Sequence, residues 1–383
     1  MRNQLAFLLS MLFWQGCAFG FVGQEKAQVV EIDGVRHIQN PAIPAKGTVL
    51  LDIEKVLEIN PYDNPDVALK SIFSARLDDG AIILYDINDS KAYLFSAEGK
   101  YERDLVRNGQ GPGEFSPRSL LLIHPMKNQI WISGGLKLAK FDRNGRFLGE
   151  LKTGDMVLQF VDENSYVTDA EMRSPDFTTH KKILLKKIEA QNRIVEGPIF
   201  KEGTYIKWIR NPNGPGGFSD IWCTPDIEYA ADPRMRRVYI VEKVDYKIEV
   251  KDLEGKTLFV IERPVKRCKV SRKDVEIAKS YLAKDERSRW ILDAYPNELM
   301  AIQEMKPLSN GYLAVYRITG LMKYELDVFD SEGRYQYILK LPEGMSLHSE
   351  QFYDFGFGTI EGRGDYPVYV QYRVKNLPDV FRR

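Results

Sequence analysis

The fold of this chain is decided by ten residues near its C-terminal end, Leu326-Asp327-Val328-Phe329-Asp330-Ser331-Glu332-Gly333-Arg334-Tyr335. Apolar and polar residues alternate up to Asp330, as they do in a β-strand, and a second strand begins at Arg334. Between them, an Asp side chain can accept hydrogen bonds from the amides of a turn, and Gly333 can adopt the positive φ that other residues resist. The stretch therefore predicts a β-hairpin.

This hairpin is repeated along the chain. Related stretches occur at 93–101, 138–147 and 248–256, and a weaker copy at 184–199 carries Gln191-Asn192 at its turn. A further short apolar strand precedes each copy, at 81–85, 129–132, 165–167, 237–241 and 311–315. The turn residues Gly99, Gly145 and Asn192 are 46 and 47 positions apart, which is the length of one β-propeller blade.

The period then lengthens to 63 residues between Asn192 and Gly255, and to 78 residues between Gly255 and Gly333. The first of these two longer intervals contains residues 203–220, which include a run of Pro and Gly at 211–217. Pro and Gly disfavour regular structure, so we expect this segment to be a loop inserted between blades.

The second of these intervals contains a predicted helix over residues 271–293. Ser271 can cap its first turn, Asp274 lies within that turn, and Pro296 follows its end. We therefore expect one inserted helix between blades four and five.

Only one more pair of strands fits after Gly333, at 352–357 and 366–372, so the last blade lacks strands of its own. The segments 48–53 and 56–59 can supply them and close the ring, which would remove an exposed sheet edge. The fold class that follows is all-β: a six-bladed β-propeller of four-stranded blades.

The first residues are typical of a signal peptide, predicted over 1–20, because Arg2 precedes an apolar run too short to span a bilayer. The sequence is compatible with two ways of processing this signal peptide. Trp14-Gln15-Gly16-Cys17 is similar to a lipobox, in which the cysteine is lipidated, although Trp14 is unusual there; ordinary cleavage after Gly20 is the other. Residues 21–42 are then expected to be a linker, and 43–383 a single propeller domain.

Composition excludes some partners and constrains the chemistry. Lys plus Arg equals Asp plus Glu at 54 each, so the basic excess of a nucleic-acid-binding protein is missing. His37, His124, His180 and His348 have no spacing that would place two of them on one metal ion. Cys223 and Cys268 can pair in an oxidising compartment, but two separate buried thiols are the simpler expectation.

A glycine-rich string, Arg107-Asn108-Gly109-Gln110-Gly111-Pro112-Gly113-Glu114-Phe115, stands between the first and second hairpins. It lacks the Lys and Ser or Thr of a phosphate-binding Walker loop, and Pro112 has no amide to donate. With the hairpins and the leader, the string resembles the exported six-bladed β-propeller proteins of Gram-negative bacteria, which are NHL-like and often predicted to be lipoproteins. The resemblance implies fold and export, and it carries no catalytic residues.

Candidate ligand-binding residues come from two loops. Asn108, Gln110 and Glu114 lie in the glycine-rich string, for which a shaped crossover between blades is the competing interpretation. The others are the aromatic residues Trp208, Phe218 and Trp222, in or beside the Pro/Gly loop. A basic run over 263–273 could meet acidic glycans or lipid head groups, although such runs are usually solvated.

The sequence thus predicts a cell-envelope binding or scaffold propeller, periplasmic or at the outer membrane, that presents loops to a protein, peptide or glycan. Membrane contact is expected only through a lipid on Cys17. No catalytic motif, metal site or cofactor is evident. The alternative is a lactonase-like hydrolase or lyase with a divalent cation such as calcium in the central channel, because each blade contributes residues there.

Overall fold

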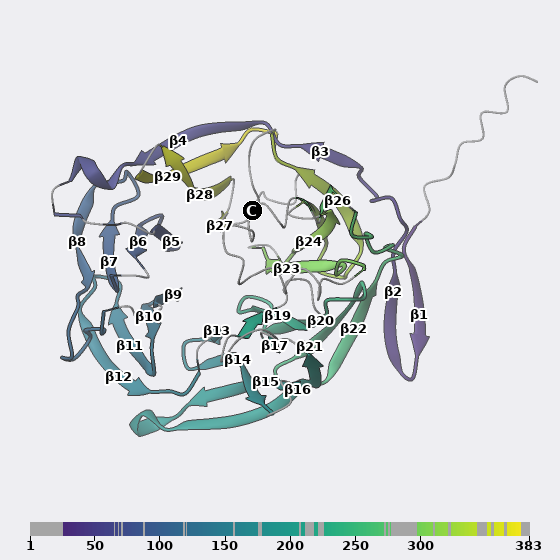
Figure 1. Ribbon diagram of the computed structural model, residues 1–383, viewed down its shortest axis with the longest axis horizontal. Helices are drawn as coiled ribbons and strands as arrows, with labels where there is room; N and C mark the ends of the chain where they lie inside the picture. Colours follow the sequence, from purple (N-terminus) through teal and green to yellow (C-terminus); the bar gives the residue numbers. More distant parts are fainter. Residues whose placement is uncertain are drawn as a thin grey trace, which may run out of the picture.

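The computed structural model shows a ring of β-sheets around a central axis (Figure 1). The residues it describes are 26–64, 66–67, 69, 72–86, 89–117, 119, 121–155, 158–174, 178–206, 208–210, 218–220, 226–271, 273–274, 276, 297–308, 311–320, 323–342, 351–353, 356–363 and 366–376. Among them, no helix is long and apolar enough to cross a membrane. Two short 3-10 turns, η1 (Pro61–Asp63) and η2 (Ala190–Asn192), accompany the strands.

The first three blades follow one another along the chain as four-stranded antiparallel sheets, each running from an innermost to an outermost strand. Blade one is β5 (Ile72–Arg76), β6 (Ile82–Asp86), β7 (Lys91–Phe95) and β8 (Tyr101–Val106). Blade two is β9 (Leu121–Pro125), β10 (Gln129–Gly134), β11 (Lys137–Asp142) and β12 (Phe147–Lys152). Blade three is β13 (Leu158–Asp162), β14 (Ser165–Arg173), β15 (Thr178–Ile188) and β16 (Ile194–Ile206).

The other three blades share the pattern and complete the predicted count of six. Blade four is β19 (Ile227–Asp232), β20 (Arg237–Glu242), β21 (Lys247–Asp252) and β22 (Thr257–Glu262). Blade five is β23 (Ile302–Pro307), β24 (Leu313–Gly320), β25 (Lys323–Phe329) and β26 (Tyr335–Lys340). Blade six is β27 (Gln351–Tyr353), β28 (Gly356–Arg363), β29 (Tyr366–Val374) and a strand from the N-terminal part, β4 (Ile53–Ile59).

The repeated turns form as their chemistry predicts. Asp330 Oδ1 accepts the amides of Glu332 and Arg334 at 3.0 and 2.9 Å, and Gly333 has a φ of +81°. The same pair of bonds to turn amides is made by Ser96, Asp142 and Asp252. In the weaker copy, Gln191 and Asn192 both have positive φ. All five predicted hairpins are confirmed.

The N-terminal segment, residues 28–59, runs along the outer rim of three successive blades (Figure 1); we call it the strap. Its first part, β1 (Gln28–Ile32) and β2 (Val35–Gln39), is a hairpin that adds two strands to blade four. Next, β3 (Thr48–Leu50) adds a parallel strand to blade five. Last, β4 pairs with β29 and closes blade six.

The strap corrects two details of the prediction. Residues 21–42 were expected to be a linker, but 28–39 form a regular hairpin. Closure was expected to use both 48–53 and 56–59, whereas β4 alone closes blade six and β3 belongs to blade five. The physical reason is direction: β3 lies parallel to the outermost strand of blade five, so the chain can continue along the rim to blade six without turning back.

The two predicted insertions also differ in detail. Residues 203–220 are not a loop throughout, because β16 extends to Ile206 and the segment also holds the paired strands β17 (Trp208–Arg210) and β18 (Phe218–Asp220). The predicted helix over 271–293 falls mostly outside the described residues; within it, residues 273, 274 and 276 are described and are helical. Ser271 and Asp274 do exchange the hydrogen bonds of a helix cap, with the Asp274 amide 3.1 Å from Ser271 Oγ.

The core consists of apolar side chains packed between neighbouring blades. Each blade is buried on both faces, as the fully buried strands β6 and β10 show. The clusters join adjacent sheets: one links blades one and two, and another links blades four and five with Ile38 of the strap. This rigid ring fixes the positions of the connections at its two ends.

Candidate binding face

The two ends of the ring carry connections of very different length. One end, which we call the crossover face, carries the links from the outermost strand of each blade to the innermost strand of the next. Its longest links are 207–226, between blades three and four, and 263–301, between blades four and five. The other end, the turn face, carries links of at most five residues between the strands named above. The long connections that are available to contact a ligand are therefore concentrated at the crossover face, near blades three to five.

The glycine-rich string forms the crossover between blades one and two. Glu114 turns back on the loop, and its Oε2 accepts the amide of Gly111 at 2.9 Å. Gln110 Nε2 donates to Ser116 Oγ at 2.9 Å, and Asn108 forms a backbone bridge with Phe115. The three predicted ligand-binding residues thus lie together at the crossover face, and Gln110 and Glu114 also hold the loop in shape.

A lysine and a glutamate of blade two contact this loop and hold it against the blade. Lys137 Nζ lies 3.2 Å from Glu150 Oε2 and donates to the carbonyl of Glu114. Glu150 in turn accepts the amide of Gly113 at 3.0 Å. Partial burial acts to raise the pKa of Glu150, but the Gly113 amide and the Lys137 ammonium lower it below its usual value. Gly113 has a φ of +72° and leaves no room for a Cβ beside Phe147, which explains the need for glycine there.

The predicted aromatic residues occupy the crossover between blades three and four. Register places Trp208 opposite Asp220 and Phe218 opposite Arg210 in the β17–β18 pair. Trp222 lies outside the described residues. The structure thus brings both groups of predicted residues to one face, but on different blades: Asn108, Gln110 and Glu114 join blades one and two, and Trp208 and Phe218 follow blade three.

A buried ionic cluster lies between blades three and four at the same face. Lys181, from β15, has its ammonium 3.4 Å from Asp169 and 3.2 Å from Asp226. Lys243 and Glu228 of blade four pair at 2.9 Å. Burial raises the pKa of the Asp169 and Glu228 carboxyl groups, against the effect of the nearby lysines. Sequence reasoning missed this cluster, because its members come from three strands, the β20–β21 turn and one crossover.

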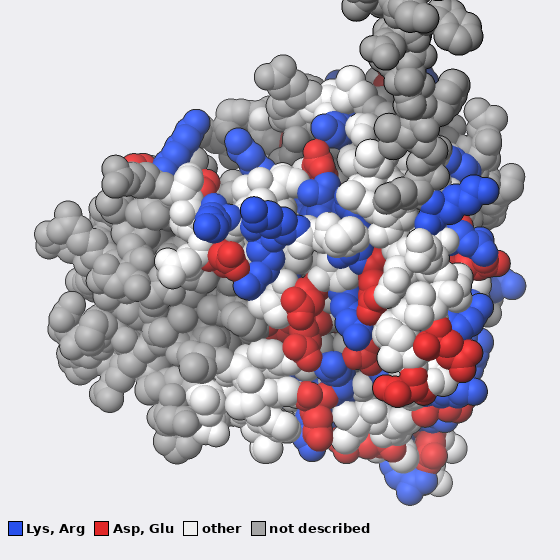
Figure 2. All heavy atoms as spheres, turned by 90° about the vertical axis from the view of Figure 1, so that its right-hand side faces the viewer, with Lys and Arg blue, Asp and Glu red and all other residues white. Residues whose placement is uncertain are grey.

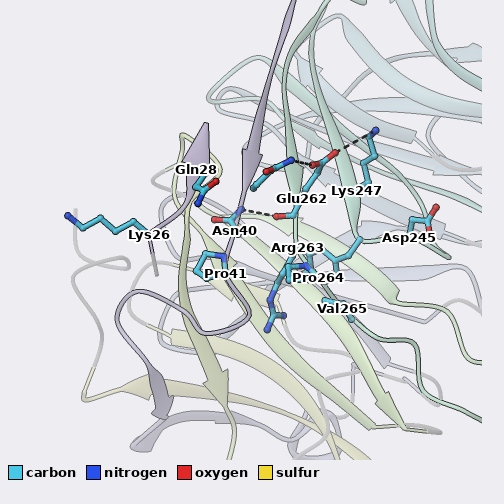
Figure 3. A pocket seen from close by; sticks show the side chains of 12 residues that line it. Lys26, Gln28, Asn40, Pro41, Asp245, Lys247, Glu262, Arg263, Pro264 and Val265 are labelled. Carbon is cyan, nitrogen blue, oxygen red and sulfur yellow. Dashed lines mark hydrogen bonds and ion pairs between the residues drawn. The ribbon is translucent and has the colours of Figure 1, made fainter. Parts of the chain in front are cut away.

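A pocket of about 740 Å³ opens where the strap meets blade four (Figure 3). The hairpin contributes one wall, and the β20–β21 turn and the start of the 263–301 crossover contribute the other, so the pocket belongs to the crossover face. Its lining is mostly polar or charged, and consists of Lys26, Gln28, Gln39, Asn40, Pro41, Asp245, Tyr246, Lys247, Glu262, Arg263, Pro264 and Val265.

Two residues fix the pocket wall. Glu262 Oε1 accepts from His37 Nδ1 at 2.9 Å and pairs with Lys247 at 3.6 Å. Asn40 donates to the backbone carbonyls of Glu262 and Gly333 at 3.3 and 2.9 Å (Figure 3 shows the first). The strap and blades four and five are thereby tied together beside the pocket.

The basic run over 263–273 is not a solvated segment at its start. Arg263 is buried; its guanidinium pairs with the fully buried carboxylate of Asp327 and donates to the carbonyl of Ala42 at 2.8 Å. Arg267 pairs with Glu298 at 2.6 Å. Cys268 donates to the carbonyl of Ile318 at 3.6 Å, and Cys223, its predicted alternative partner, lies outside the described residues.

The three described histidines have different partners. His37 pairs with Glu262, His124 lies 3.2 Å from Ser133 Oγ, and His180 lies 3.3 Å from Thr204 Oγ1. Burial lowers the pKa of His124 to about 4. His348 lies outside the described residues. Within the part of the chain that the structure describes, no three His, Cys, Asp or Glu side chains are grouped as a metal site would require.

The fold and this geometry can now be compared with known proteins. Residues 63–186 match a family model. That family, DUF5128, is described as a 6-bladed beta-propeller. The matched segment covers blades one and two and, in blade three, β13, β14 and most of β15. No curated protein matches the sequence.

Solved structures of other proteins align with most of the chain. An exported protein of Bacteroides fragilis has 12% identity and a TM-score of 0.47, with 88% of this chain and 99% of that chain covered. A DUF4221 family member of Bacteroides vulgatus has 9% identity and a TM-score of 0.48, covering 86% and 100%. Virginiamycin B lyase of Staphylococcus aureus has 9% identity and a TM-score of 0.41, covering 84% and 100%.

Proposed function

We propose that this chain is an exported binding or scaffold propeller that recognises a protein, peptide or glycan at its crossover face, over blades three to five. One observation carries the proposal: both of the longest connections, 207–226 and 263–301, leave the ring at this face. The long strands β14, β15 and β16 of blade three also extend toward it, with Arg173 paired to Thr179 and Thr178 paired to Ile206. Extra structure on a regular scaffold is where specificity usually resides.

The chemistry of this face favours a polar ligand. The pocket beside the strap offers amide groups from Gln28 and Gln39 and charges of both signs from Lys247 and Glu262. Such a mixed set suits hydroxyl, amide and charged groups on a sugar or a peptide. The aromatic residues Trp208 and Phe218 in the neighbouring crossover are of the type that stacks on sugar rings.

We further propose that the protein acts in the cell envelope, in the periplasm or at the outer membrane, held by a lipid on Cys17. The support is the apolar leader and the Gly16-Cys17 junction. An anchor at Cys17 lies only ten residues before Ala27, so it would hold the rim of blade four within about 36 Å of the bilayer even with the linking residues fully extended.

The test is to replace residues 207–221 by an eight-residue Gly/Ser linker. This keeps Ile206, whose pairing with Thr178 ends the β15–β16 ladder. Loop-closure entropy changes slowly with length, so the melting temperature should shift by only a few degrees. Binding to the ligand found for the wild-type chain on glycan arrays or in envelope extracts should be lost.

The matched control inserts the same linker into the 253–256 turn, on the turn face. This control should bind like the wild type. Unchanged binding by the trimmed chain, or equal loss in both variants at unchanged melting temperature, would rule out the crossover between blades three and four as the recognition surface.

A further inference from the structure

The outermost strand of the molecule, β1, is an open sheet edge that stands clear of the ring (Figure 1). It is the sixth strand of the blade-four sheet, and among the described strands it pairs only with β2. Every residue of β1 is exposed, including three large apolar ones: Val29 at 58%, Ile32 at 42% and Val30 at 37%. An exposed apolar edge with unused backbone groups is a template for pairing with another strand.

The outer edges of blades one, two, three and six are interrupted, and β1 is not. In each of these blades, the pairing of the outermost strand (β8, β12, β16 or β4) with its neighbour contains a shift of register. Such bulges bend an edge and make further pairing less favourable. The β1–β2 ladder runs without a shift from Gln28 opposite Gln39 to Ile32 opposite Val35. Its edge is therefore straight enough to accept a partner.

The turn of the hairpin shows which backbone groups face outward. Asp33 and Gly34 form a two-residue turn with φ of +51° and +77°, as in a type I′ turn. Such a turn closes on a hydrogen-bonded pair, here Ile32 with Val35, and bonded pairs alternate along an antiparallel ladder. Gln28, Val30 and Ile32 thus bond to β2, and the amides and carbonyls of Val29 and Glu31 point away from the sheet.

We propose that β1 pairs with β1 of a second copy of this chain, antiparallel and centred on Val30. In this register Val29 of one copy faces Glu31 of the other and exchanges both backbone hydrogen bonds with it. Val30 then faces Val30 of the partner in a non-bonded pair, and Gln28 faces Ile32. No like charges lie directly opposite each other, and the apolar side chains Val30 and Ile32 gather on one face.

The surroundings of the hairpin permit this approach. Figure 2 shows the side of the molecule that carries β1, and its described Lys, Arg, Asp and Glu side chains are interspersed. The described charges on this side form no field of a single sign that would repel an identical copy. A pair of five-residue strands buries much less than the roughly 1,600 Å² of a standard interface. The dimer should therefore be weak and reversible, and should form at high protein concentration.

Register-specific crosslinking tests the pairing. In a non-bonded antiparallel pair the Cα atoms are about 4.5 Å apart, which a disulfide can span. Val30→Cys should therefore form a disulfide-linked dimer under mild oxidation. Val29→Cys should not, because Val29 is offset by two positions from its own copy. Leu148→Cys, 51% exposed on β12, is the control for random collision, and the unmodified chain is the control for Cys223 and Cys268.

A second variant separates pairing from folding. Val29→Pro removes an outward amide and leaves the β1–β2 bonds of residues 28, 30 and 32 in place. It should keep the melting temperature of the wild type and abolish the concentration-dependent rise in sedimentation coefficient. Crosslinking of Val30→Cys no faster than Leu148→Cys, equal crosslinking at positions 29 and 30, or a wild-type monomer at every concentration would each overturn the proposal.

Discussion

Asp327 is the residue with the greatest local consequence. Its carboxylate is fully buried, and it accepts hydrogen bonds from the hydroxyls of Tyr246 and Tyr335, both at 2.8 Å, and from the guanidinium of Arg317 at 2.9 Å. The guanidinium of Arg263 also pairs with Asp327, and it donates a hydrogen bond to the carbonyl of Ala42 in the strap. One carboxylate therefore joins blade four, blade five and the strap.

Asp327→Asn should destabilise the protein by about 3–5 kcal/mol, because it leaves Arg263 and Arg317 facing a neutral amide in a buried site. Chemical denaturation at neutral pH measures the change in the free energy of unfolding. Tyr335→Phe, which removes one donor and keeps both charges, should cost about 1–2 kcal/mol. A loss under 1 kcal/mol for Asp327→Asn would show that the cluster does not hold the blades together.

Asp327 and Asp330 show what sequence can predict at this scale. Asp330 acts within its own turn, on amides two and four residues away, so local spacing was enough to assign it. Asp327 lies three residues earlier in the same stretch, but its partner Arg263 comes from another blade. Alternation within a strand indicates that a residue faces inward and does not indicate which residue it meets.

Among the elements, β4 has the most demanding role, because blade six has only three strands without it. Ile59 lies opposite Tyr369 and Glu58 opposite Val370 in the pairing that completes the ring. Ile59 is also buried in the cluster between blades six and one. The N-terminal and C-terminal parts of the chain are thus held in one sheet.

Removing residues 1–26 should leave a protein that does not aggregate and melts cooperatively, because the strap is intact. Removing residues 1–59 should expose β29 as an unpaired edge and yield aggregated protein. Size-exclusion chromatography and thermal melting compare the two truncations. A monomer with a normal melting transition after the longer truncation would contradict closure by β4.

The strap also shows where the prediction of elements failed. Asp33-Gly34 lies between Gln28–Ile32 and Val35–Gln39, and Asp-Gly between β-branched residues is among the strongest hairpin patterns in a sequence. The pattern was present, but it lay outside the repeat and residues 21–42 were taken as a linker. Repeats identify the blades well and give no information about segments that occur once.

For the whole molecule, the fold could be predicted and the ligand could not. Five repeated hairpin turns, three of them Asp-x-x-Gly, mark five blades, and the strands left over fit one more, since each blade repeats one local pattern. The candidate face gathers residues as distant in sequence as Lys26 and Arg263. Their proximity depends on the pairing of β2 with β22, which no local pattern encodes.

Cys17→Ser should move the protein from the membrane fraction to the soluble envelope fraction, because a lipid on Cys17 would be its only attachment to the bilayer. Partition between detergent and aqueous phases measures the change. Ser10→Ala, in the leader but away from the lipobox, should behave like the wild type. Membrane association that persists in Cys17→Ser would exclude anchoring at this residue.

The strap has one more consequence, for the order of folding. It is made first, yet each of its pairing partners, β22, β26 and β29, is made much later. The strap therefore has no sheet to join until the second half of the chain exists, and the last pairing joins strands from almost opposite ends of the sequence. Such non-local closure is slow. A chain that is exported from the cytoplasm with its N-terminus leading can complete its ring only after its last strand has followed.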